Sequence, residues 1–171
     1  MPVRLGLLGD THGELRSARL LLGRMGKIDL LLHTGDYYDD AMQLARWPEL
    51  KGVVVHGVLG NGDYLLDGPR QITLDLQGHR LWLVHGHQHE VKRTLARLDH
   101  EAQRLKADVV VFGHTHVSGV FQQHGLLLVN PGSPGFPRGA APGSAAVLEI
   151  TPGGVQADLL ELIQSGPAQQ S

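Results

Sequence analysis

Cysteine is absent from the chain of 171 residues, which excludes a disulfide framework and any metal site built on thiolates. The chain also has no large excess of charge of either sign. It has 15 lysines and arginines and 17 aspartates and glutamates, so its formal net charge is −2. No basic field is therefore available for general binding to nucleic acid or membranes. An anionic substrate must be held by local charge.

Long apolar runs are lacking as well. The longest are about as long as a strand, far below the roughly 20 residues that cross a bilayer, and the apolar stretch before Asp10 is too short for a signal peptide. We therefore expect a soluble cytoplasmic protein. Its length and its 42% apolar content suit one domain, which we assign to residues 1–164, with residues 165–171 as a disordered tail.

The apolar pattern predicts strands and helices in alternation. In the first sixty residues we expect strands at 3–9, 28–33 and 52–60 and helices at 14–26 and 39–47. In the remainder we expect a hairpin at 70–85, a helix at 90–106 with one apolar stripe, a strand from 109, a hairpin at 118–130, and strands at 144–150 and 155–163. The fold class is α/β, with the β-rich second half forming a second layer or extending the sheet.

Histidine is unusually abundant, with 11 residues where a chain of this length would carry roughly four. Several histidines follow apolar strands, and four of five strand ends place a glycine directly before the polar residue. Ligands bind beyond the carboxyl ends of strands in open α/β sheets. We therefore expect seven side chains to converge in one crevice. They are Asp10, His12, Asp36, Asn61, His85, His114 and His116.

Carboxylates, a carboxamide and imidazoles without sulfur suit a divalent cation of intermediate hardness, such as Mn²⁺, Fe²⁺, Co²⁺, Ni²⁺ or Zn²⁺. Seven such ligands are too many for one transition-metal ion. They suit two divalent metal ions per chain that share a carboxylate, so the sequence predicts a binuclear metal site.

Five short motifs resemble those of the calcineurin-like metallophosphoesterase family: D-x-H at 10–12, G-D-x-x-D at 35–39, G-N-x-D at 60–63, H-G-H at 85–87 and G-H-x-H at 113–116. The small size and the N-P-G-S stretch at 130–133 resemble its compact YfcE-type phosphodiesterase branch, which also includes the retromer scaffold subunit. The match covers about residues 3–150. The resemblance implies a four-layer α/β/β/α sandwich of two facing mixed β-sheets with flanking helices.

The resemblance also implies a role for each ligand. Asp36 would bridge two ions, Mn²⁺ by preference, together with a solvent hydroxide that attacks phosphorus in line. The other six residues would divide between the ions, the first taking Asp10, His12 and His116 and the second taking Asn61, His85 and His114. The function implied is that of a metal-dependent phosphodiesterase, with Asp36 as a catalytic residue.

One position departs from the family pattern. The family's G-N-H-D motif has a histidine that contacts the leaving group, and this chain has Gly62 there. The YfcE-type branch also usually lacks that histidine, so Gly62 supports the branch and argues against an efficient protein phosphatase. Asp63 loses its usual partner, and capping of the following turn is its alternative role. We nominate His87, at the edge of the site, as a catalytic residue that contacts substrate.

We interpret most of the other polar residues as structural rather than catalytic. We expect His33 to be a packed strand residue and His89 to lie outside the site. Asp39 and Asp40 could orient site groups, but capping of their helix explains them equally well. Arg138 is read as a loop anchor, with contact to a substrate phosphate as the alternative. Four further histidines are read as structural or exposed, namely His56, His79, His100 and His124.

Two alternatives to a phosphodiesterase stay open. One is a phosphomonoesterase or nucleotide pyrophosphatase that uses the same site. The other is a non-catalytic scaffold like the retromer subunit, although a scaffold has no need to keep all seven ligands. As partners we expect a small phosphoester substrate and neither nucleic acid nor membrane, and a homo-oligomer is left open.

Overall fold

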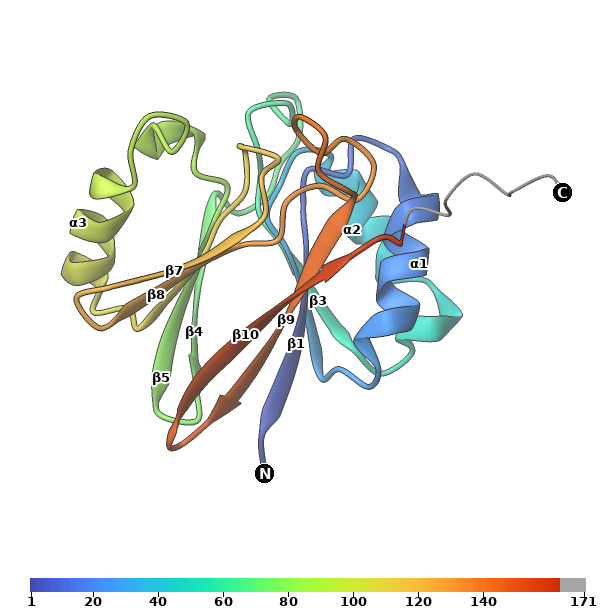
Figure 1. Ribbon diagram of the computed structural model, residues 1–171. Coiled ribbons are helices and arrows are strands. Elements are labelled where there is room, and N and C mark those ends of the chain that lie inside the picture. Colours follow the sequence, from blue (N-terminus) through green and yellow to red (C-terminus); the bar gives the residue numbers. More distant parts are fainter. Residues whose placement is uncertain (164–171) are drawn as a thin grey trace, which may run out of the picture.

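Two facing five-stranded β-sheets form the centre of the computed structural model, which describes residues 1–163 (Figure 1). The first sheet has the strand order β10 (Gly154–Glu161), β9 (Ser144–Thr151), β1 (Val3–Leu8), β2 (Leu30–His33) and β3 (Val54–Gly57). The second has the order β4 (Gln71–Leu76), β5 (His79–Val84), β6 (Val109–Val111), β8 (Leu126–Asn130) and β7 (Gly119–Gln123).

Helices cover the outer faces of both sheets (Figure 1). The first sheet carries α1 (Leu15–Met25) and α2 (Tyr38–Leu44), and the second carries α3 (Ala96–Leu105). Two short 3₁₀ helices, at Pro48–Leu50 and His87–His89, lie in connecting loops. The predicted α/β/β/α sandwich of two mixed sheets is confirmed.

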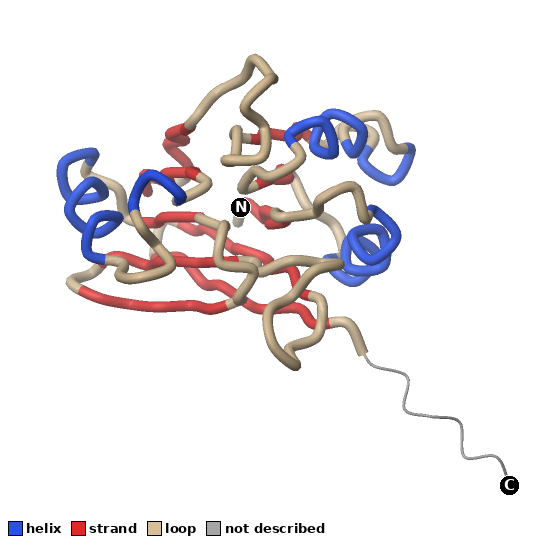
Figure 2. The backbone as a smooth tube through the Cα atoms, turned by 90° about the horizontal axis from the view of Figure 1, so that it is seen from above, coloured by secondary structure: helices blue, strands red, loops and turns tan. Residues whose placement is uncertain are grey.

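Both sheets are parallel where they form the site. The strands β1, β2 and β3 run parallel to one another, as do β5, β6 and β8, whereas β9, β10, β4 and β7 pair antiparallel at the sides. Parallel strands end at the same edge of a sheet, so the loops after β1, β2, β3, β5 and β6 gather over one end of the sandwich. Figure 2 looks down on these loops, between the helices of the two sides.

The core follows the alternation of each strand. Leu5 and Leu7 of β1 pack between the sheets, whereas Leu8 packs under α1. On the other side, Trp82 and Phe112 pack under α3. An apolar cluster therefore fills each space between neighbouring layers of the sandwich. These clusters fix the strands whose ends carry the polar residues.

The helix predicted at 90–106 is wrong at its start, because α3 begins only at Ala96. Residues 90–95 form turns, and Glu90 has a φ of 53°. Val91 is nevertheless buried, and a Cβ on Gly86 would lie only 3.1 Å from its side chain. The apolar stripe thus continues through turns that bury the same side, which the periodicity alone could not distinguish from a helix.

Among residues 1–163, no helix is long and apolar enough to span a membrane. The predicted boundary at residue 164 and the predicted tail at 165–171 lie outside the described residues. All other strands and helices lie where the sequence predicts them, within a few residues at their ends.

Candidate metal centre

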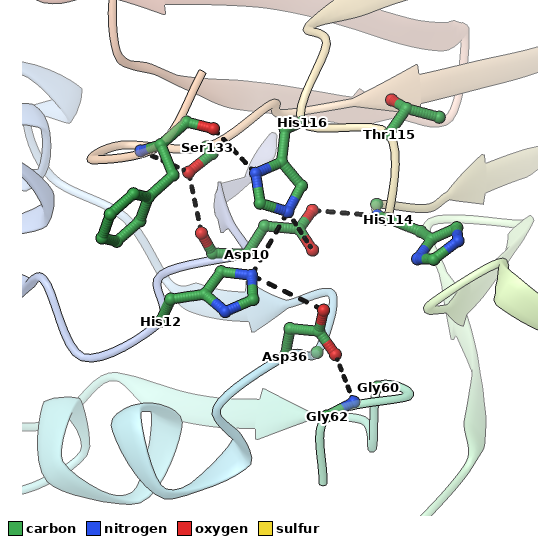
Figure 3. Close-up of polar contacts among 12 residues, drawn as sticks. Asp10, His12, Asp36, Gly60, Gly62, His114, Thr115, His116 and Ser133 are labelled. Carbon is green, nitrogen blue, oxygen red and sulfur yellow. Dashed lines mark hydrogen bonds and ion pairs between the residues drawn. The ribbon is translucent and has the colours of Figure 1, made fainter. Parts of the chain in front are cut away.

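Three predicted ligands that follow strands of the first sheet meet one that follows β6 of the second sheet. In this first cluster (Asp10, His12, Asp36 and His116), one ligand atom of each residue lies within 4.8 Å of the others (Figure 3). The Nε2 atom of His12 is 3.2 Å from Nε2 of His116 and 3.5 Å from Oδ2 of Asp36. The Nε2 atom of His116 is 3.6 Å from Oδ1 of Asp10. These atoms point at one common space.

A second cluster (Asp36, His85 and His114) forms across the gap between the sheets. The Nε2 atom of His85 is 3.5 Å from Oδ1 of Asp36, 3.2 Å from Nδ1 of His114 and 3.0 Å from Oδ1 of Asn61. Asn61 therefore completes this cluster. Asp36 belongs to both clusters and turns one oxygen to each. All seven predicted ligands are thus brought together, while their role as metal ligands stays a prediction.

The geometry of both clusters fits metal ions. Two atoms that each lie about 2.1 Å from one ion are roughly 3.0–3.4 Å apart, close to the separations within the clusters. The Oδ1 atom of Asp10 is buried and has no hydrogen-bond partner. An unpartnered buried carboxylate oxygen is costly, and a cation beside it removes that cost. Burial and the nearby Asp36 carboxylate raise the pKa of Asp10, and a cation bound between the two carboxylates would offset both effects.

Backbone carbonyls orient two of the imidazoles. The Nδ1 atom of His85 donates to the carbonyl of Thr34 at 2.9 Å, and Nδ1 of His116 donates to the carbonyl of Phe136 at 2.7 Å. A carbonyl can only accept, so each Nδ1 carries the proton and each Nε2 presents a lone pair to its cluster. This arrangement is the usual support for a metal-binding histidine.

Five of the seven candidate ligands have left-handed backbone conformations. The φ values are 49° at Asp10, 47° at His12, 54° at Asp36, 71° at His114 and 58° at His116. Each such residue costs roughly 1–2 kcal/mol relative to the ordinary right-handed region. Strain of this kind concentrates at functional sites, because surrounding contacts are needed to hold it.

Three of the four glycines that directly precede ligands serve close approach rather than backbone freedom, whereas Gly35, before Asp36, has a φ of 102°. A Cβ on Gly9 or on Gly113 would collide with the Thr34 side chain, and one on Gly60 would collide with Asp36. None of these three glycines has a positive φ. The strand ends therefore come together because these positions have no side chain, and at Asp10 and His114 the sharp bend falls on the ligand that follows.

A buried network holds the loop that carries His12. The Thr11 hydroxyl donates to Asp40 at 2.6 Å and accepts from Nε2 of His33 at 2.9 Å. The amide of Gly13 donates to the same Asp40 carboxylate at 2.8 Å. Asp40 thus orients the site loop rather than capping its own helix, since its carboxylate accepts from Thr11 and Gly13. His33 is buried in its strand, as predicted.

Asp63 ties two site loops together. Its Oδ1 accepts from the amides of Tyr37 and Tyr38 at 3.0 and 2.9 Å, and its Oδ2 accepts from Gly60 at 2.8 Å. The side chain therefore holds the turn after Asp36 against the loop that carries Asn61. Its predicted alternative role, capping the turn that follows it, is not what the carboxylate does.

The N-P-G-S stretch supports the site from a third direction. The Ser133 hydroxyl donates to the carbonyl of Asp10 at 2.7 Å (Figure 3). The Asn130 amide donates to the carbonyl of Gly113 at 3.2 Å. These residues hold the two loops that carry the first cluster. Their motif was visible in the sequence, whereas the carbonyls of Thr34 and Phe136 left no signal, because a backbone acceptor can belong to any residue.

His87 lies beside the second cluster, with its ring 5.3 Å from the ring of His85 and 6.1 Å from that of His114. Its Nδ1 atom is buried without a partner, and burial lowers its pKa. His89 instead packs edge-on against Trp82 at 5.2 Å, outside the site, as predicted. The backbone amide of Arg138 donates to the carbonyl of His116, so Arg138 does anchor its loop, and its side chain is exposed.

The four remaining histidines lie away from both clusters. His100 and His124 are exposed, and His56 and His79 are partly buried in β3 and β5.

Two buried histidines make the metal-free protein sensitive to acid. Burial lowers the pKa of His33 to about 3 and that of His85 to about 4. Unfolded imidazole titrates near 6.5, so as pH falls below this value the unfolded chain binds more protons at both positions and stability falls. The raised pKa of Asp10 acts in the opposite direction, because there the folded chain binds the extra proton.

Burial also lowers the pKa of His114 to about 4, so three histidines stand against one aspartate and stability should fall as the pH drops from 6 to 4.5. Urea denaturation in EDTA measures this fall. The variant His33→Gln keeps a donor and an acceptor and should make the fall shallower. A slope that is flat in the wild type would mean that the buried imidazoles are already protonated in the fold.

Comparisons with known proteins agree with this geometry. A family model described as the calcineurin-like phosphoesterase superfamily domain matches residues 3–153. The probable metallophosphoesterase YsnB of Bacillus subtilis strain 168 is 32% identical over 145 residues, which are 84% of this chain and 82% of that protein.

Solved structures share the fold. A conserved protein of Streptococcus pneumoniae TIGR4, a predicted phosphoesterase, has a TM-score of 0.76 and 27% identity and covers 94% of this chain and 90% of its own. Vacuolar protein sorting 29 of Cryptosporidium parvum has a TM-score of 0.73 and 22% identity, with 94% and 98% covered. The second similarity shows the fold alone. With the family model matched over residues 3–153, the chain belongs to the calcineurin-like phosphoesterase superfamily, whose members include probable metallophosphoesterases.

Proposed function

We propose that the protein is a phosphodiesterase that uses two divalent ions, Mn²⁺ by preference, held by the seven clustered residues. The observation that carries the proposal is the position of Asp36, which turns one oxygen to each of two clusters whose other members are mostly neutral. When bound, the ions would supply charge stabilisation of the phosphoryl oxygens and activation of water.

The chain's own residues keep the site cationic. Two ions carry +4, and Asp10 and Asp36 return −2, because asparagine and unprotonated imidazoles are neutral. Burial lowers the pKa of His85 and His114 to about 4, so both rings are neutral at physiological pH. The surplus of positive charge favours an anionic phosphate, which the net charge of the whole chain would not attract.

Two nearby hydroxyls are already engaged, and that of Thr34 has no partner but is fully buried, so all three are poor candidates for a nucleophile. Ser133 donates to the carbonyl of Asp10 and accepts from the amide of Phe136, while Thr11 donates to Asp40. An attack by water, rather than by a side chain, suits this arrangement. The protein residues would then position the substrate and orient the ligands.

Gly62 favours a diester over a monoester. It is exposed, and its amide donates to Oδ1 of Asp36 at 2.9 Å, so open space lies directly beside the shared carboxylate. One of the two ester substituents, the leaving group, can lie there without meeting a side chain. The same gap removes a proton donor for the leaving group, which suits esters whose leaving group departs as an anion.

The test compares bis(p-nitrophenyl) phosphate, p-nitrophenyl phosphate and ADP-ribose after loading the protein with Mn²⁺. We expect hydrolysis of the diester with a kcat/KM at least tenfold above that of the other two. Preference for p-nitrophenyl phosphate would establish a phosphomonoesterase, and preference for ADP-ribose a nucleotide pyrophosphatase.

The scaffold alternative rests on the fold shared with vacuolar protein sorting 29. Metal bound at both clusters with no hydrolysis of any ester would favour it. The complete set of ligands at coordination spacing favours an enzyme. We further propose that the substrate is a small phosphoester and that no nucleic acid or membrane is needed for activity.

A further inference from the structure

A second hollow lies on the outer side of the loop that carries His114 and His116. This groove, of about 620 Å³, runs between the turns before α3 and strand β7. Six of its lining residues carry the argument below, and we call it the α3 groove. They are Val91, Lys92, Phe112, Thr115, Phe121 and Arg138.

The α3 groove adjoins the metal centre. Thr115, between two candidate ligands in the chain, points away from their rings and lines the groove (Figure 3). Arg138 lines both the groove and a separate hollow whose wall includes His12 and His116. Lys92 and Arg138 are near enough that their charges counteract the effects of burial and Asp36 on the pKa of Asp10. A molecule at the metal centre can therefore extend past Arg138 into the groove.

The lining combines an apolar floor with a cationic rim. Val91 and Phe112 are buried beneath it, and the Phe121 ring is 44% exposed, which is unusual for a phenylalanine. Lys92 and Arg138 are exposed at the rim, neither forms an ion pair among residues 1–163, and no acidic residue lines the groove. This chemistry suits a ligand with a flat apolar ring and a negative group.

We propose that the α3 groove binds the second ester substituent of the substrate, and that this substituent is a nucleotide unit with an aromatic base and a phosphate of its own. The proposal rests on the proposed phosphodiesterase function. The base would stack on Phe121. The additional phosphate would lie between Lys92, which provides a localised positive charge, and Arg138, which can donate two parallel hydrogen bonds. The groove volume is in the usual range for a small-molecule site, about 300–1,000 Å³.

The experiment compares two substrates with the same leaving group, thymidine 5′-(p-nitrophenyl phosphate) with and without a 3′-phosphate. In the Mn²⁺-loaded protein we expect the 3′-phosphate to raise kcat/KM about tenfold, the size of one good charged contact. Lys92→Gln and Arg138→Gln should each remove most of that gain. The matched control is Arg46→Gln, which removes an exposed cation beyond α2 and should keep the gain.

A binding measurement separates this proposal from the function on which it rests. Thymidine 3′,5′-bisphosphate is titrated calorimetrically into the protein in EDTA, where no hydrolysis occurs. Binding that Lys92→Gln and Phe121→Ser weaken supports the groove even if no ester is hydrolysed. If both substrates are hydrolysed at equal rates and the bisphosphate does not bind, the proposed nucleotide binding in the α3 groove is wrong. The proposed phosphodiesterase function would still hold. If Phe121→Ser does not change the binding of the bisphosphate, the proposed contact between the base and Phe121 is wrong.

Discussion

Replacing Asp36 by asparagine should remove metal from both clusters and lower kcat for a diester at least a thousandfold. The carboxylate turns Oδ2 to the first cluster and Oδ1 to the second. An asparagine has the same shape but only one oxygen, so its NH₂ group would face one of the two clusters and could not bind a cation there. The loss of one negative charge also weakens attraction for both ions.

Metal analysis after gel filtration gives the number of ions per chain, and the thermal midpoint with and without Mn²⁺ gives the stabilisation on binding. Wild type should bind two ions and gain stability, and Asp36→Asn should do neither. Asp39→Asn is the matched control, because Asp39 is an exposed carboxylate three residues further along the chain. Two ions and full activity in Asp36→Asn would refute the shared-carboxylate assignment.

The second prediction concerns the leaving group. General-acid catalysis is typically worth 10²–10⁴-fold, and the position that would supply it is Gly62. A Cβ there would lie 3.3 Å from Oδ1 of Asp36, and the backbone conformation is one that any residue adopts. A histidine therefore fits after a small shift. Gly62→His should accelerate hydrolysis of alkyl esters and change nitrophenyl esters little.

His87 is the residue placed to substitute in part for the missing histidine. Its ring lies beside the second cluster, and His87→Ala should slow alkyl esters more than nitrophenyl esters. Burial lowers its pKa, so its acidic form is scarce at neutral pH, and its contribution should grow as the pH falls.

The measurement is the slope of log kcat against leaving-group pKa for the wild type and both variants, each with its metal content verified. We expect a shallower slope for Gly62→His and a steeper one for His87→Ala. Three parallel lines would show that neither position protonates the leaving group.

The sequence predicted most of the fold and all the members of the two clusters for one reason. Apolar strands that end abruptly in polar residues fix both the sheet edge and the chemistry at that edge, so Asp10, Asp36 and His114 could be placed together without coordinates. The two-sheet arrangement came from the family resemblance, since strand periodicity does not say which strands pair.

What the sequence could not predict depends on contacts that leave no residue pattern. The carbonyl of Thr34 orients His85, and any residue could have provided that carbonyl. The sequence left two roles open for Asp40, orienting site groups or capping its helix, because its partners Thr11 and Gly13 are far away in the chain. The start of α3 was misplaced because turns and helices can bury the same side of a segment.

The left-handed ligands also bear on how this chain could lose its activity. A descendant that served only as a binding platform could replace any of these five residues by glycine, each exchange relieving roughly 1–2 kcal/mol of strain. In this chain, none of the five positions has taken that step.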